Sequence, residues 1–112
     1  MNRNKLINLF ISNLATAILH KILEKAIDKL EITEKYHKEV KNSWEIAKTY
    51  REKINPIDKT LPVHDIEEIR SKIIAKAKNE LNIRISKGYT HIDISLVEGL
   101  VDECLKELGI TD

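Results

Sequence analysis

Four histidines carry the most versatile side-chain chemistry in this sequence, because imidazole binds metals and transfers protons near neutral pH. They are His20, His37, His64 and His91. Glu34 and His37 have the spacing of helical di-iron sites, but such sites need a second Glu-x-x-His pair and further glutamates. The chain has no second pair. We therefore expect no metal site and no cofactor, and we assign the histidines to capping, surface or interface positions.

Covalent catalysis also finds little support. Cys104 is the only cysteine, which excludes an intramolecular disulfide. Its neighbours Asp102 and Glu103 would raise the pKa of the thiol and make it a poor nucleophile. The sequence contains no glycine-rich phosphate loop and no serine in a strand-turn-helix elbow. The pattern predicts no catalytic residue and favours a protein that is not an enzyme.

One segment resembles a known family. Gly88, Tyr89, Thr90, His91, Ile92 and Asp93 precede an apolar helical segment, and this stretch of about a dozen residues resembles the end of the HEPN family. HEPN proteins are helical and include dimeric ribonuclease toxins, in which an Arg and a nearby His cleave RNA. Aligned on this tail, Asn82 and Lys87 stand at the family's Arg and His positions, so the chain departs from the motif.

Arg84 and His91 offer the same two residue types in a different register, with six residues between them. The resemblance thus implies an alternative function, in which Arg84 and His91 serve an RNA-cleaving or nucleotide-binding helical protein.

Basic side chains follow the second helical segment. They are Lys35, Lys38, Lys41, Lys48, Arg51 and Lys53, with Tyr36, Trp44 and Tyr50 nearby. Four glutamates are interleaved with them, at positions 34, 39, 45 and 52. Ordinary ion pairing along a helix surface accounts for this pattern, and the acidic side chains of the last segment would repel phosphates. We expect nucleic acid not to be the partner.

Hydrophobic spacing predicts four helices in one all-α, four-helix bundle-like domain covering residues 1–112. The first helix is expected from Asn4 to Leu30, before a break at Ile32 and Thr33, and the second from Glu34 to Ile54. A loop follows around 56–63. The third helix is expected from a capping pair, Asp65 and Glu68, to Gly88, and the fourth from Asp93 or Ser95 to Gly109. Ile83, Ile85, Ile92 and Ile94 also alternate, which leaves a short β-hairpin near residues 83–94 as an alternative.

Leu6 to Leu19 contains no charged residue, although 33% of the chain is charged. As a helix this segment has no broad polar side, so it is expected to be a central core element or an interface. We favour an interface that covers Leu6, Phe10, Leu14, Ile18 and His20 with a second chain. The protein is then a non-catalytic interaction module, either a homodimer or a small subunit of a larger assembly.

A polar line crosses the same helix at every fourth residue. Its members are Asn8, Ser12, Thr16, His20, Glu24 and Asp28. The line is either solvent-exposed or a buried seam that sets the register between subunits.

The uncharged run is too short to cross a bilayer, since fourteen residues span roughly 21 Å at 1.5 Å each. Asparagine and serine interrupt it, which also argues against a cleaved signal peptide. We expect a cytoplasmic protein without a membrane span.

The formal charge of +1 divides unevenly along the chain. Residues 1–55 hold eleven Lys and Arg against seven Asp and Glu, whereas residues 56–112 hold eight against eleven. Excesses of this size are ordinary for solvated surface, although they could also favour head-to-tail pairing. The abundance of Ile and Lys and the absence of Gln are typical of thermophile proteins.

Overall fold

A computed structural model describes residues 2–27, 30–56 and 58–112. These residues form four helices and no strand: α1 (Arg3–Ala26), α2 (Leu30–Ile54), α3 (Val63–Ser86) and α4 (Leu96–Glu107). The prediction of an all-α, bundle-like fold is confirmed. The alternative hairpin near residues 83–94 is wrong, because Ile83 and Ile85 belong to the end of α3. Ile92 and Ile94 pack against the core from the loop that follows.

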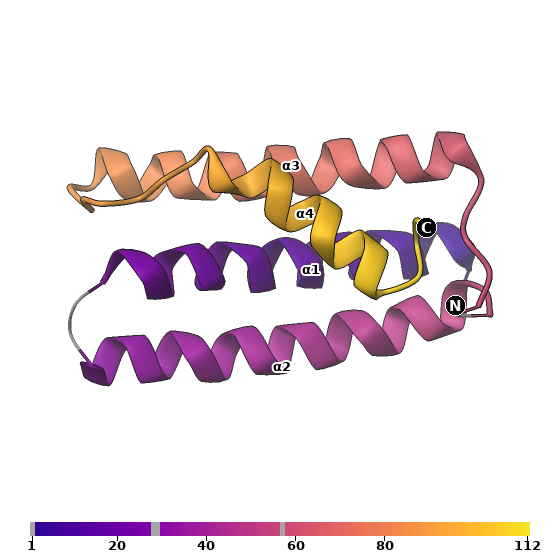
Figure 1. Cartoon of the computed structure of the whole chain (residues 1–112), viewed down its shortest axis with the longest axis horizontal. Coiled ribbons are helices and arrows are strands. Elements are labelled where there is room, and N and C mark those ends of the chain that lie inside the picture. The colour runs from indigo at the N-terminus through magenta and orange to yellow at the C-terminus, as the bar shows by residue number, and fades with distance from the viewer. Residues whose placement is uncertain (1, 28–29, 57) are drawn as a thin grey trace.

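Helix α1 is the centre of the molecule. It lies between α2 and α3, while the shorter α4 crosses in front of α1 and α3 (Figure 1). Among the described residues α1 packs against all three other helices, whereas α2 packs closely against α1 alone. A helix with neighbours on several sides needs apolar residues all round, which explains the uncharged run in α1.

The junction between α1 and α2 differs from the expected one. Helix α1 ends at Ala26 and α2 already begins at Leu30, so Ile32 and Thr33 lie inside α2 rather than at a break. The Thr33 hydroxyl donates to the Ile27 carbonyl at 3.1 Å. Thr33 therefore satisfies a carbonyl just beyond the end of α1 instead of capping the start of α2.

Helices α1 and α3 begin in different ways. Asn2 caps α1, because its side-chain oxygen accepts the Lys5 N–H at 2.8 Å. Helix α3 begins two residues before Asp65, directly after Pro62, and Asp65 instead accepts a hydrogen bond from Arg3 at 2.5 Å. This ion pair ties the first turn of α1 to the first turn of α3.

Glycine follows the ends of both later helices, as expected. Gly88 has φ +98 and Gly109 has φ +72, which are left-handed values that glycine adopts without a Cβ clash. Helix α4 begins after Ser95, whose side chain makes no capping bond to the helix. The Asp93 carboxylate accepts both the backbone N–H and the hydroxyl of Ser95.

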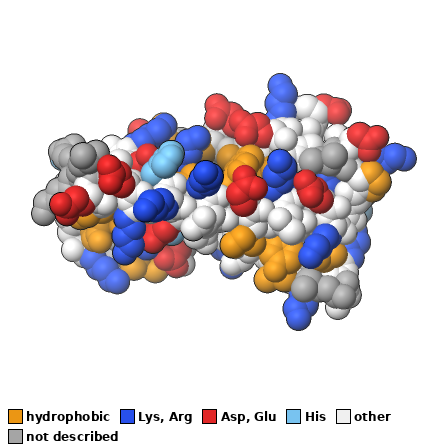
Figure 2. Space-filling model, turned by 90° about the horizontal axis from the view of Figure 1, so that it is seen from below, with side chains coloured by type: hydrophobic (Ala, Val, Ile, Leu, Met, Phe, Trp, Pro, Cys, Tyr) orange, Lys and Arg blue, Asp and Glu red, His pale blue; other side chains and the backbone are white. Residues whose placement is uncertain are grey.

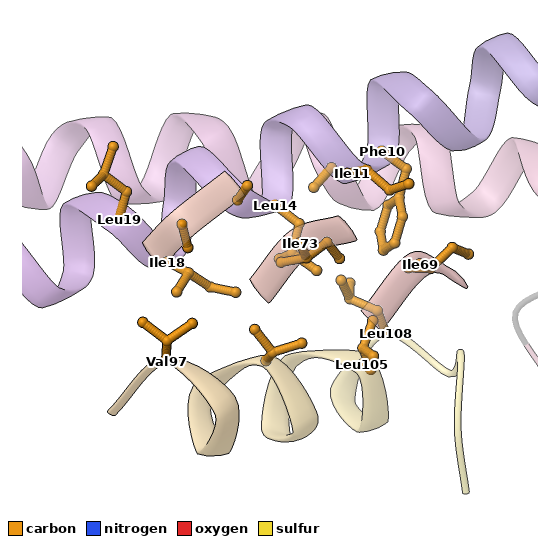
Figure 3. Packing of buried hydrophobic residues seen from close by; sticks show 14 of the residues in the cluster. Phe10, Ile11, Leu14, Ile18, Leu19, Ile69, Ile73, Val97, Leu105 and Leu108 are labelled. Carbon is orange, nitrogen blue, oxygen red and sulfur yellow. The ribbon is translucent and has the colours of Figure 1, made fainter. Parts of the chain in front are cut away.

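The core forms where α1, α3 and α4 meet. Figure 3 shows side chains of α4 directed at α1, with residues of α3 beside them. Ten residues in this region are at most 2% exposed: Phe10, Ile11, Leu14, Ile18, Ile69, Ile73, Val97, Val101, Leu105 and Leu108. Helix α2 adds the wholly buried Ala47 and the partly buried Tyr36, Trp44, Tyr50 and Ile54.

Taken as a whole helix, α1 is long and apolar enough to cross a membrane by length and composition. Core helices and signal sequences have the same properties, and 56% of its most apolar window is buried against the rest of this chain.

Candidate functional site

The proposed interface residues of α1 are covered largely by their own chain. Phe10 and Leu14 are 0% exposed and Ile18 is 1% exposed, all within the core formed with the other helices. Leu6 and His20 are half-buried. A second copy of the chain is therefore not required to cover Phe10, Leu14 and Ile18.

The polar line of α1 changes character along the helix. Asn8 and Ser12 are exposed, and the Thr16 hydroxyl donates to the Ser12 carbonyl within the same helix. Further along, His20 and Glu24 pair with α2, at 3.2 Å from Glu39 and 3.2 Å from His37 respectively. The line thus begins at the surface and continues as a seam within one chain. Its last member, Asp28, lies outside the described residues.

His20 is the central group of a cluster at this end of the molecule. Its ring stacks on Tyr36 with 5.4 Å between centroids and 23° between planes. Burial lowers the pKa of His20 and outweighs the opposing effect of Glu39, and the positive charge of Arg84 lowers it further. A neutral imidazole donates to Glu39 through Nε2–H, so Nδ1 is the acceptor nitrogen. Among the described residues this buried Nδ1 has no hydrogen-bond partner.

Arg84 and His91, the residues of the RNA-cleaving alternative, have different surroundings. The Arg84 guanidinium pairs with Glu80 at 3.1 Å, one turn earlier in α3. His91 is exposed in the loop before α4 and has φ +65. It lines an open cavity of about 840 Å³, whose lining does not include Arg84.

Tyr36 contacts His20 and also lines the cavity that contains His91. Burial raises the pKa of Tyr36, the neighbouring Tyr89 and Glu39 add to this effect, and the charge of Arg84 opposes it. Tyr36 and Tyr89 both line the same cavity as His91. Sequence spacing did not indicate this cluster, because it combines residues from α1, α2, α3 and the loop before α4.

The basic side of α2 is less extensive than the sequence suggested. Arg51 was expected on the exposed side, but it is 0% exposed. Its guanidinium donates to the carbonyls of Leu108 (2.7 Å), Lys59 (2.9 Å), Gly109 (3.0 Å) and Asn55 (3.2 Å). On the side of the molecule that includes α2, Figure 2 shows blue and red side chains interspersed. An interspersed surface of this kind gives phosphates little net attraction.

A groove lies between α2 and α4, with α1 at its floor. Its volume is about 300 Å³, and Ala17, Ile18, Val40, Trp44 and Cys104 supply its apolar surface. His37 and Lys41 line it from α2, and Lys21 lines it from α1, whereas Glu103 and Glu107 line it from α4. One wall is therefore basic and the other acidic. The groove depends on how α4 crosses α1, which sequence spacing does not specify.

Cys104 is not activated within this groove. Burial raises the pKa of its thiol to about 11, with Glu107 and Glu103 adding to the rise and Lys21 opposing it. The thiol is thus protonated at neutral pH and is a weak nucleophile.

In the part of the chain that the structure describes, no group of three or more His, Cys, Asp or Glu side chains is arranged to hold a metal ion. Comparison with protein-family models, curated proteins and solved structures gave no significant match.

Proposed function

We propose that this protein is a non-catalytic helical interaction module that pairs with a second copy through the groove between α2 and α4. The supporting observation is the combination of an apolar floor with one basic and one acidic wall. Such a groove is unlike an ordinary solvated surface, where the two signs of charge are mixed. A cytoplasmic location and the absence of a membrane span belong to the same proposal, since α1 uses its apolar side chains within the chain.

Opposite walls make the groove complementary to itself. Twofold symmetry is the commonest symmetry of homo-oligomers, and it brings the same surface of two copies together. A twofold axis parallel to the groove places the α2 wall of each copy against the α4 wall of the other. Lys41 then meets the acidic pair of the second copy, Glu103 and Glu107. Val40 and Trp44 are covered at the same time, and tryptophan is enriched at such interfaces.

Charge reversal tests this pairing directly. One variant carries Lys21→Glu with Lys41→Glu, so both its walls are acidic, and the other carries Glu103→Lys with Glu107→Lys, so both are basic. We expect light scattering to show a wild-type dimer and two monomeric variants, because like charges then face each other in each homodimer. Mixing the two variants should restore a dimer, since each acidic wall meets a basic one.

The control exchanges charges away from the groove. Lys72→Glu with Glu68→Lys reverses an exposed ion pair of α3 and should leave the assembly unchanged. Circular dichroism of each variant separates dissociation from unfolding. A monomeric wild type at all concentrations, or folded variants that fail to form a dimer when mixed, would overturn the proposal.

A further inference from the structure

We propose that the cavity at the opposite end of α2 from Arg51 binds a small aromatic anion. Three segments form it: Ala26 and Ile27 at the end of α1, three residues of α2 (Ile32, Lys35 and Tyr36), and the loop from Gly88 to His91. In Figure 1 the first turns of α2, the end of α1 and the end of α3 lie at the same end of the molecule. This inference is independent of the groove between α2 and α4.

The cavity is large enough for a small molecule. Its volume of about 840 Å³ falls within the range of about 300–1,000 Å³ that is typical of ligand sites. Ile27 and Ile32 give it apolar walls, while Tyr36 and Tyr89 give it aromatic ones. Aromatic rings of a ligand pack well against tyrosine, either offset or edge to face.

The position of Tyr36 is fixed by the residues behind it. One face of its ring is occupied by His20, and His20 is held by Glu39 at 3.2 Å. A ring that is already held in place loses little conformational entropy when a ligand binds, which favours affinity.

The charge of the lining favours an anion. Lys35 contributes a cation, and no Asp or Glu is among the described residues that line the cavity. Outside the lining, Arg84 is paired with Glu80 at 3.1 Å, and Glu39 faces His20 at 3.2 Å. Their charges act on Tyr36 in opposite directions, Arg84 lowering its pKa and Glu39 raising it. A phosphate or carboxylate attached to an aromatic ring would thus find a cation and apolar contacts together.

The loop places His91 at this cavity through an uncommon backbone conformation. His91 has φ +65, a left-handed value that costs a non-glycine residue free energy. Gly88, three residues earlier, has φ +98. The two left-handed residues turn the chain back from α3, so Tyr89 and His91 both line the cavity.

A titration of the ¹⁵N-labelled full chain tests the site with three probes: phenyl phosphate, inorganic phosphate and benzyl alcohol. We expect phenyl phosphate to shift the amide signals of Lys35, Tyr36 and Tyr89 in a saturable way. The other two probes should bind at least about tenfold more weakly, because inorganic phosphate lacks the aromatic ring and benzyl alcohol lacks the negative charge.

Two lysines of α2 supply the matched variants. Lys35→Glu should weaken phenyl phosphate binding by about tenfold or more, as expected for losing a charged hydrogen-bond donor. Lys38→Glu makes the same change at an exposed residue outside the lining and should leave binding unchanged. Equal effects of the two variants, shifts centred elsewhere, or no saturation with phenyl phosphate would overturn the proposal. Retained signal dispersion in each variant shows that it is folded.

Discussion

Arg51 connects the end of α2 with two other parts of the chain through one guanidinium group. Its acceptors are the backbone carbonyls of Asn55, Lys59, Leu108 and Gly109 and the side-chain amide oxygen of Asn55. Within the described residues no carboxylate pairs with it, and burial lowers its pKa. A planar guanidinium with five N–H donors can serve several carbonyls at fixed angles, which an ammonium group cannot do. Arg51 is therefore a structural residue, although its position in a basic run suggested a surface role.

Replacing Arg51 should destabilise the protein strongly. Arg51→Ala leaves buried carbonyls without donors and opens a cavity, so we expect the free energy of unfolding to fall by about 3 kcal/mol. Arg51→Lys should recover little of this loss. Urea unfolding measures both variants, and the exposed Lys48→Ala on the same helix should change stability by no more than about 0.5 kcal/mol. Wild-type stability in Arg51→Lys would contradict the assigned role.

His20 should make the fold sensitive to mild acid. Because burial lowers its pKa below the ordinary 6.5, the unfolded chain binds the proton more readily than the folded one. Stability is thus complete above pH 6.5 and declines as the pH falls from there through the folded pKa. His20→Gln should remove this part of the pH dependence of urea unfolding, whereas His64→Gln, at an exposed residue, should retain it.

Asp65 affects a separate and lower pH range. The hydrogen bond from Arg3 holds the pKa of Asp65 below its ordinary 3.8, so its stabilising contribution is lost only as the pH falls below that value. An acid transition of identical shape in wild type and His20→Gln between pH 7 and 5 would contradict the role given to His20.

Helix α4 contacts the rest of the bundle through both ion pairs and apolar packing. Arg70 binds Asp102 through two hydrogen bonds of 2.7 and 3.2 Å, and Lys78 binds Glu98 at 3.1 Å. All four side chains are substantially exposed, where ion pairs contribute little. The apolar face of α4 is wholly buried instead. Apolar packing therefore holds α4 to the bundle.

Substituting a buried apolar residue of α4 should therefore destabilise the protein more than breaking one of its exposed ion pairs. Leu105→Ala should lower the free energy of unfolding by about 3 kcal/mol, because it leaves a cavity in the core. Arg70→Gln should lower it by less than about 1 kcal/mol, and this loss should shrink in high salt. Thermal unfolding at two salt concentrations gives both values. A larger loss for Arg70→Gln than for Leu105→Ala would show that the ion pairs dominate.

The sequence predicted the presence of each helix more reliably than its first and last residues. Apolar spacing predicted four helices, and glycine predicted the stops near Gly88 and Gly109. The start of α2 was placed four residues late, because Ile32 and Thr33 were interpreted as a break between helices. Thr33 and Asp65 can each bond to local backbone or to a distant partner, and both bond outside their own helix starts. Local sequence does not decide between these choices.

At the scale of the whole molecule, the all-round apolar character of α1 predicted either a core element or an interface, and α1 lies among the three other helices. It did not show whether α1 is covered by its own chain or by another, because that depends on how α3 and α4 pack. The groove and the cavity escaped prediction for the same reason. The cavity joins Ile32 and Tyr36 to Tyr89 and His91, and no periodicity connects positions more than fifty residues apart.

The central position of α1 has a consequence for synthesis of the protein. Helix α4, which completes the cover over Leu14 and Ile18, begins 70 residues after α1 ends. At roughly 5–20 residues per second, the ribosome needs several seconds to make the intervening chain. During that interval α1 can pack only against α2 and then α3, and the apolar side chains that α4 covers are open to neighbouring nascent chains. The most buried helix of the finished protein is thus incompletely covered until the last helix has been made.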